Sequence, residues 1–196
     1  MELIEDYKKY KWFFTSSGKL VIGGKSAVQN DELLKRIKSL DKDFVIMHTA
    51  EPGSPFSIIL SDINKVIKED IKECAIFTGC FSRAWRSGKK KAIVDVFKVS
   101  KINKLKSMKT GTWGVIGKIQ KLAVNLELVL TRQKGILRAV PEASVKSDKE
   151  KLIKVCPGKI DKKDMLSKLQ MEVDETFSSD EVLSALPAGG AKICRK

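Results

Sequence analysis

The sequence has little of what metal centres and redox sites are usually made of. Its 196 residues contain one histidine, His48, and four cysteines, at positions 74, 80, 156 and 194. No two cysteines form a C-x-x-C pair, so we predict neither a zinc knuckle nor a redox pair, and we expect unpaired thiols in a reducing compartment. With a single histidine as well, no metal and no cofactor are expected.

Long hydrophobic runs are also absent. No stretch of 18 apolar residues exists, so the sequence predicts no transmembrane helix and no membrane partner. The first ten residues, MELIEDYKKY, are mixed and acidic, unlike the basic and then apolar order of a signal peptide. We therefore expect a cytoplasmic protein, and its hydrophobic fraction of 42% is sufficient for a sizeable core.

Acidic residues are nearly missing from one part of the chain. Residues 82–121 hold 12 lysines and arginines but only one carboxylate, Asp95, whereas residues 1–81 have no net charge. Most of the net charge of +14 therefore lies in 40 residues. Such a concentrated positive field attracts a polyanion, although a solvated lysine-rich face is the simpler alternative.

Hydrophobic periodicity predicts the elements of the first part of the chain. The aromatic run 12–15 and the apolar run 20–22 flank a turn and predict a hairpin, followed by a helix over 25–38. Further strands are expected at 43–48, 56–60, 92–97, 112–116, 119–130 and 136–140. Residues 65–85 carry a broad apolar stripe and predict one helix of five to six turns, in which Gly79 would permit another element to come close.

Residues 141–150 are polar and predict a linker, which divides the chain into a domain at 1–140 and a small α/β lobe at 151–196. The lobe reads as a strand, a helix over 162–171, a second helix with a capping box from Ser178 to Glu181, and a last strand. The predicted fold class is α+β: a mostly antiparallel sheet flanked by helices, with a β-α-α-β lobe at the C-terminal side.

Four ordered motifs carry a family resemblance. They are residues 12–31, the segment HTAEPGSP that starts at His48, the segment FSRAW at 81–85, and GTWGVIGK at 111–118. In order and spacing this set resembles the NFACT-R domain, the RNA-binding module of the NFACT proteins of ribosome quality control, across roughly residues 8–130. The resemblance implies RNA as the partner, such as tRNA or ribosomal RNA, and the ribosome as a further one. The chain looks like a free-standing form of this module.

The candidate RNA-binding residues combine cations with stacking surfaces. Gly23 and Gly24 precede a helix whose free N–H groups, together with Lys25, could meet one phosphate. The spacing of a nucleotide-hydrolysing phosphate loop is not matched here. Arginine makes bidentate phosphate contacts, and tryptophan offers a stacking face. Trp85 continues an apolar stripe and favours the core, whereas Trp113 is equally consistent with core packing and stacking. The predicted site is Lys25, His48, Arg83, Arg86, Lys89, Lys90, Lys91, Lys109, Trp113 and Lys118.

Catalysis is not predicted, because nothing in the sequence supplies His48 with a nucleophile or an orienting carboxylate. The expected function is a non-catalytic RNA-binding module that recognises structured RNA through a basic face. Two alternatives remain open: an RNA-modifying enzyme or the accessory subunit that delivers RNA to one, and a protein adaptor on the ribosome.

Overall fold

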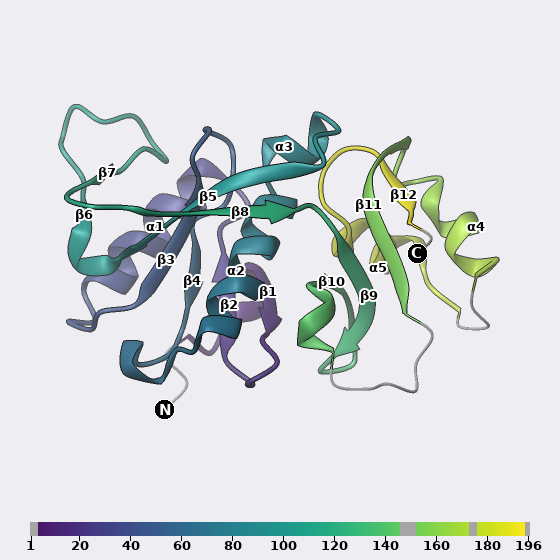
Figure 1. Cartoon of the computed structure of the whole chain (residues 1–196), viewed down its shortest axis with the longest axis horizontal. Coiled ribbons are helices and arrows are strands. Elements are labelled where there is room, and N and C mark those ends of the chain that lie inside the picture. Colours follow the sequence, from purple (N-terminus) through teal and green to yellow (C-terminus); the bar gives the residue numbers. More distant parts are fainter. Residues whose placement is uncertain (1–3, 146–151, 173–175, 195–196) are drawn as a thin grey trace.

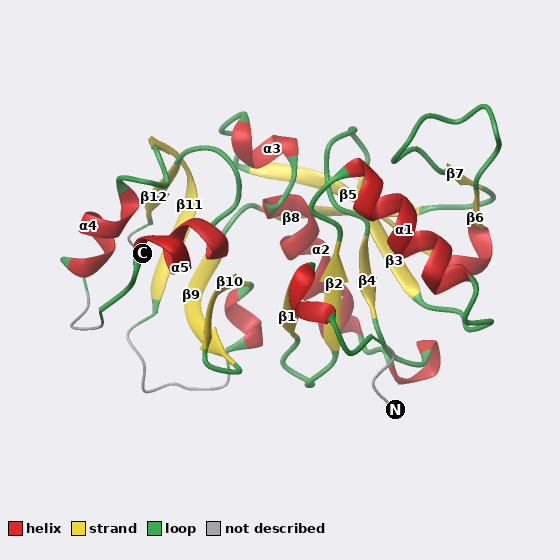
Figure 2. Cartoon of the chain, turned by 180° about the vertical axis from the view of Figure 1, so that it is seen from behind, coloured by secondary structure: helices red, strands yellow, loops and turns green. Residues whose placement is uncertain are grey.

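The computed structural model describes residues 4–145, 152–172 and 176–194. Two antiparallel sheets lie side by side along the long axis of the molecule, with helices packed on both (Figure 1). The predicted α+β class is confirmed. Seen from behind, α1 and α2 lie with the larger sheet, and α4 and α5 lie with the smaller one (Figure 2).

The larger sheet has six strands in the order β1-β2-β4-β3-β5-β8, and every pairing in it is antiparallel. The predicted hairpin at its edge is confirmed, with Trp12 opposite Ile22. Its strands are β1 (Lys11–Phe14), β2 (Leu20–Gly23), β3 (Val45–Thr49), β4 (Ser57–Ile59), β5 (Lys91–Lys98) and β8 (Gln120–Asn125).

Helices α1 (Ala27–Lys38) and α2 (Lys68–Cys80) cover opposite faces of this sheet. Neighbouring residues of a strand point to opposite faces. Trp12 accordingly packs in the cluster that contains α1, while Phe13 packs in the cluster that contains α2. The strands β1 to β4 are therefore mostly buried on both faces and mainly apolar, whereas the edge strand β8 alternates exposed and half-buried residues.

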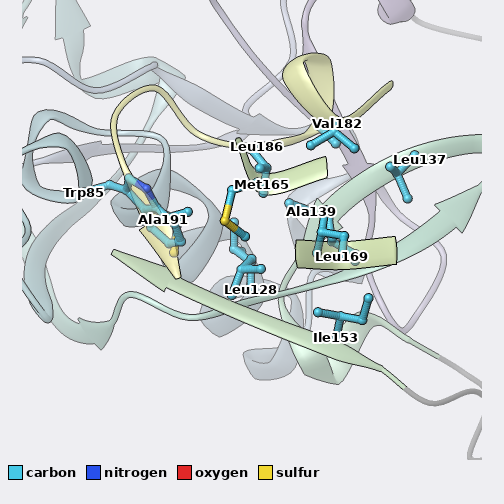
Figure 3. Packing of buried hydrophobic residues seen from close by; sticks show 14 of the residues in the cluster. Trp85, Leu128, Leu137, Ala139, Ile153, Met165, Leu169, Val182, Leu186 and Ala191 are labelled. Carbon is cyan, nitrogen blue, oxygen red and sulfur yellow. The ribbon is translucent and has the colours of Figure 1, made fainter. Parts of the chain in front are cut away.

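The smaller sheet has the order β10-β9-β11-β12. Met165, Leu169 and Val182 from the helices α4 and α5 pack against its strands, and Trp85 reaches the same core beside Ala191 (Figure 3). The elements of this part are β9 (Leu128–Gln133), β10 (Ile136–Val140), β11 (Ile153–Ile160), α4 (Met165–Gln170), α5 (Ser179–Ala185) and β12 (Ala191–Ile193). The capping box between Ser178 and Glu181 is present at the start of α5.

The expected division of the chain at residues 141–150 runs through this smaller sheet. Strands β9 and β10 precede that segment, β11 and β12 follow it, and β9 pairs directly with β11. Residues 142–144 form a 3₁₀ turn, and 146–150 lie outside the described residues. The smaller sheet is thus assembled from strands on both sides of the expected linker.

The two sheets meet where the edge of β1 faces β10. The side chain of Gln133 bonds both backbone groups of Phe14, at 2.7 Å to the N–H and 2.9 Å to the carbonyl. Nearby, Arg138 Nε donates to the carbonyl of Trp12 at 3.1 Å. Side chains of the smaller sheet therefore form hydrogen bonds with backbone groups of β1, the edge strand of the larger sheet. Without them, this edge would be open to pairing with another chain.

Two predicted elements are wrong in extent. The helix expected over 65–85 ends at Cys80, and Ser82 caps a separate short helix, α3 (Arg83–Arg86). The strand expected over 119–130 is divided into β8 and β9, which belong to different sheets. In addition, β7 (Gly114–Val115) pairs with β6 (Ile102–Asn103) instead of the larger sheet. The break between β8 and β9 takes the chain from the larger sheet to the smaller one.

The cysteines differ partly from expectation. Cys74 and Cys80 are free and fully buried. Cys156 and Cys194 instead form a disulfide that links β11 to the residue after β12, with their Cα atoms 6.2 Å apart. No sequence signal indicated this pair, because the two residues come together only through the antiparallel pairing of β11 and β12.

Gly79 permits a close approach, as predicted. A Cβ atom at this position would lie 3.0 Å from side-chain carbons of Val124 and Leu126. The helix α2 therefore packs tightly against β8 and the segment that leads from it into the smaller sheet.

Trp85 joins the two parts of the molecule, so its removal should be costly. Its side chain is 0% exposed, and its Nε1 donates to the carbonyl of Gly190 at 3.1 Å. We expect Trp85→Ala to lower the free energy of unfolding by about 3–5 kcal/mol, measured by urea denaturation. The control Met171→Ala removes an apolar side chain that is 81% exposed and should change stability by less than about 0.5 kcal/mol. Equal effects of the two variants would contradict this assignment of Trp85.

Candidate nucleic-acid interface

A cleft of about 580 Å³ opens on the larger sheet. Four segments surround it: the start of α1, the loop after β3, the helix α3 and the loop before β7. Ala188, which precedes β12, adds a contribution from the C-terminal part of the chain. The walls therefore come from segments far apart in sequence, and residues of all four family-like motifs line this cleft.

The start of α1 forms one wall. Ser26 caps the helix, and its Oγ accepts from the N–H of Gln29 at 3.1 Å. Neither Gly23 nor Gly24 has a positive φ. At position 24 a glycine is required because there is no room for a side chain: a Cβ atom there would lie 2.2 Å from Oδ1 of Asn30. That oxygen accepts from the N–H of Phe56 at 3.2 Å, so it ties the helix start to β4.

The loop after β3 and α3 form the opposite wall. The N–H of Arg83 donates to the carbonyl of Gly53 at 2.8 Å. Gly53 has a φ of +106°, and a Cβ atom there would lie 3.1 Å from the side chain of Arg83. Because glycine alone tolerates this conformation at low cost, the loop can lie directly against α3. Arg83 and Arg86 are exposed at the rim as a result.

A buried carboxylate holds the loop that carries Trp113. Asp31 of α1 is 8% exposed and accepts from Lys104 Nζ at 3.0 Å, from Trp113 Nε1 at 2.8 Å and from the N–H of Gly111 at 3.0 Å. Burial opposes ionisation of Asp31, but these three donors outweigh it and lower the pKa of the carboxyl. The loop is therefore fixed over α1, so closely that a Cβ atom on Gly111 would lie 2.7 Å from Ala27.

His48 lies in the floor of the cleft, at the end of β3. Its Nδ1 is 2.7 Å from the carbonyl of Thr49, and its ring packs on Phe56 with centroids 4.4 Å apart. Burial lowers the pKa of His48, so the ring is neutral at pH 7. Asp95 stands opposite on β5 and is bonded to Lys121. His48 is consequently an aromatic, hydrogen-bonding surface rather than a fixed charge.

The structure brings together half of the predicted site residues. Lys25, His48, Arg83, Arg86 and Trp113 line the cleft. Lys89 and Lys91 line a smaller neighbouring hollow of about 220 Å³, where Lys89 forms an exposed ion pair with Glu51 at 2.8 Å. The remaining predicted residues are exposed and line neither hollow: Lys90, Lys109 and Lys118.

The two tryptophans that the sequence singled out differ in their surroundings. Trp85 is fully buried, as favoured. Trp113 is 9% exposed and donates to Asp31, while Lys104 Nζ lies 5.6 Å from its ring centroid. It is thus mainly a packed residue, with one edge in the cleft wall.

Sequence reasoning missed two residues of this site. Lys11 lines the cleft, but its place at the start of a hydrophobic strand gave no functional signal. Asp31 resembled an ordinary surface carboxylate of a helix, and only its tertiary donors distinguish it.

Residues 4–145, 152–172 and 176–194 contain no group of three or more side chains suited to hold a metal ion. None of the helices within these ranges is long and apolar enough to cross a membrane.

The chain is similar to known proteins over its first part. The model of the NFACT protein RNA-binding domain matches residues 9–117. The archaeal Rqc2 homolog aRqcH of Methanocaldococcus jannaschii is 39% identical over 82 residues, which cover 42% of this chain and 12% of that protein. The chain therefore corresponds to a small part of that relative's length.

A solved structure shares the fold. The C-terminal part of the fibronectin/fibrinogen-binding protein from Streptococcus suis superposes with a TM-score of 0.52 at 22% identity. The superposition covers 59% of this chain and 45% of that one.

Asp31 should stabilise the fold in a pH-dependent way. We expect Asp31→Asn to lower the free energy of unfolding by about 1–3 kcal/mol near pH 7, because buried donors lose a charged acceptor. Since the pKa of Asp31 is lower in the folded protein than its ordinary 3.8, its contribution is complete above that value and is lost as pH falls through the folded pKa. Thermal denaturation of both proteins over a pH series measures this difference. A gap that stays constant down to the lowest pH would contradict the role of the charge.

Proposed function

Because the chain belongs to the family of NFACT protein RNA-binding domains, we propose that it is a non-catalytic RNA-binding module whose interface is the cleft. The observation that carries this proposal is the convergence of Lys25, Arg83 and Arg86 around the start of α1. None of these three cations forms an ion pair with a carboxylate among the described residues. They are available to phosphate oxygens.

The partner is structured RNA, such as tRNA or ribosomal RNA. Lysine and arginine neutralise phosphates but identify few bases by themselves, so recognition follows the shape of a folded RNA. Beyond the cleft, Lys89, Lys90, Lys91, Lys109 and Lys118 extend the positive field over which a larger RNA would lie. The M. jannaschii relative bears the name of an Rqc2 homolog. This name supports a place for the chain in ribosome quality control in the cytoplasm, with the ribosome as a further partner.

For the alternative of an RNA-modifying enzyme, His48 is the first candidate for a proton-transferring side chain. Its Nδ1 is engaged with the carbonyl of Thr49, and the two free cysteines of the described chain are buried away from the cleft. We therefore place His48 among the residues that contact RNA. Mass spectrometry of tRNA after incubation with the protein tests this alternative, since a mass change would demonstrate a modification.

Charge reversal at the rim should weaken RNA binding without unfolding the protein. We expect the double variant Arg83→Glu, Arg86→Glu to bind tRNA at least about tenfold more weakly, because surface charges contribute mainly to association and little to folding. The matched control reverses two exposed lysines outside the cleft, Lys65→Glu and Lys72→Glu. Gel-shift titration and a melting curve are measured for each protein. Equal loss of affinity in the two double variants would remove the cleft from the interface.

Binding should depend strongly on salt, since each neutralised phosphate releases counterions. Contact with about five phosphates predicts a loss of roughly two to three decades in affinity between about 50 and 200 mM salt. The series compares tRNA, a scrambled hairpin of equal length and duplex DNA. Equal affinity for all three ligands near physiological salt would show that the protein binds polyanions without specificity. A shallow slope for every ligand would contradict the electrostatic basis.

A further inference from the structure

Four cations from four separate segments lie close enough to repel one another, and two of them line the cleft. Lys11 lies on β1 and Lys25 between β2 and α1, and both line the cleft. Arg138 of β10 and Lys162 of the turn before α4 belong to the C-terminal part of the chain, outside the family match at residues 9–117. We name these residues the inner cation cluster.

Neutral groups hold the cluster in place. Arg138 is 6% exposed, donates from Nε to the carbonyl of Trp12 and stacks its guanidinium 4.8 Å from the centroid of that ring. Lys162 Nζ donates to the carbonyl of Leu183 at 2.9 Å. Lys11 Nζ lies 5.4 Å from the ring centroid of Phe81. Within the described residues, no carboxylate forms an ion pair with any member of the cluster.

Repulsion among the cations of the inner cation cluster opposes folding of the RNA-free protein. Burial, together with the smaller effect of repulsion from Lys25, Lys162 and Arg138, lowers the pKa of Lys11 to about 8. Burial likewise lowers the pKa of Arg138 to about 10. The one carboxylate that lines the cleft, Asp95, is bonded to Lys121. A cluster of partly buried cations without a counter-charge is favourable only when an anion joins it.

We propose that the inner cation cluster is a phosphate-binding subsite that holds one phosphate of a single-stranded RNA segment or chain end inside the cleft. This proposal rests on the proposed function. A volume of about 580 Å³ lies in the range of small-molecule sites, so it admits a nucleotide but excludes a duplex. The phosphate can be an internal phosphodiester or a terminal phosphomonoester, since both present the same oxygens to Lys11 and Lys25.

Lys11 makes the subsite sensitive to pH. Below about pH 8 its ammonium group is charged and attracts phosphate, whereas above that value it is neutral in the free protein. A bound phosphate favours the charged form, so binding takes up a proton and weakens as pH rises. The other groups that face Lys11, namely Lys25, Lys162 and Arg138, add positive charge and do not reverse this direction.

The test measures RNA affinity by fluorescence anisotropy from about pH 7 to about pH 9.5. The probe is a hairpin with a short single-stranded 3′ tail that ends in a phosphate or in a hydroxyl. For the wild type we expect affinity to fall about tenfold or more across this range. Lys11→Arg should bind with a nearly flat profile, because arginine stays charged. Lys11→Met should bind at every pH about as weakly as the wild type does at the alkaline end.

A control and a second measurement keep this test decisive. Lys65→Met, at an exposed lysine outside the cleft, should follow the wild-type profile. Lys11→Met should also raise the melting temperature of the RNA-free protein below about pH 8, because it removes a repelled and half-buried charge. If Lys11→Met stabilises the fold but weakens RNA binding, Lys11 contributes to binding and not to stability.

The outcomes separate this proposal from the broader one. RNA binding that is unaffected by pH, or that keeps its pH profile in Lys11→Met, would overturn the subsite and leave the RNA-binding function intact. Absence of RNA binding at any pH would overturn both. Tighter binding of the tail that ends in a phosphate identifies a chain end as the ligand, and equal binding of the two tails identifies an internal phosphodiester.

Discussion

The buried carboxylate of Asp31 is the constraint on which the cleft depends. The loop before β7 forms few regular backbone pairs of its own, since β6 and β7 share only two residue pairs. Its position is set instead by donors from Lys104, Gly111 and Trp113 that converge on a single side chain of α1. A charged acceptor with several donors is strong inside a protein, because each donor offsets part of the cost of burial. Without this anchor, the loop before β7 would lose its fixed position over α1, and the cleft would lose one of its walls.

Carboxylates neutralise the lysines that support the fold and leave those of the cleft unneutralised. Lys19 pairs with the fully buried Asp70 at 2.9 Å, and this carboxylate also accepts from Thr15 at 2.7 Å, so the first hairpin is fastened to α2. Lys104 is paired with Asp31 in the same way. The inner cation cluster has no such partner among the described residues, and it bears the repulsion that follows. This contrast separates lysines that are neutralised within the fold from the lysines of the cleft, which have no counter-charge among the described residues.

The C-terminal part of the chain completes the site instead of standing apart from it. Trp85 enters the core of the smaller sheet and bonds to Gly190, and the preceding Ala188 then reaches the cleft. Arg138 approaches from the same side because its Nε bonds to the edge of β1. The family match ends at residue 117, yet Ala188, well beyond it, also lines the cleft. The interface that we propose is therefore a property of both sheets together.

The sequence by itself determined the fold class, the first hairpin, the helix after Gly24 and the concentration of positive charge, because these depend on local periodicity and composition. It also indicated Lys25, His48, Arg83, Arg86 and Trp113, which the tertiary structure brings to one cleft. Only the tertiary structure decided which charges are neutralised, since Glu51 reaches Lys89 and Asp31 reaches Lys104 across long separations in sequence. The same holds for the break of the long helix at Ser82, the disulfide between Cys156 and Cys194, and the role of Lys11. Each of these is set by contacts between distant segments, and local sequence carries no record of such contacts.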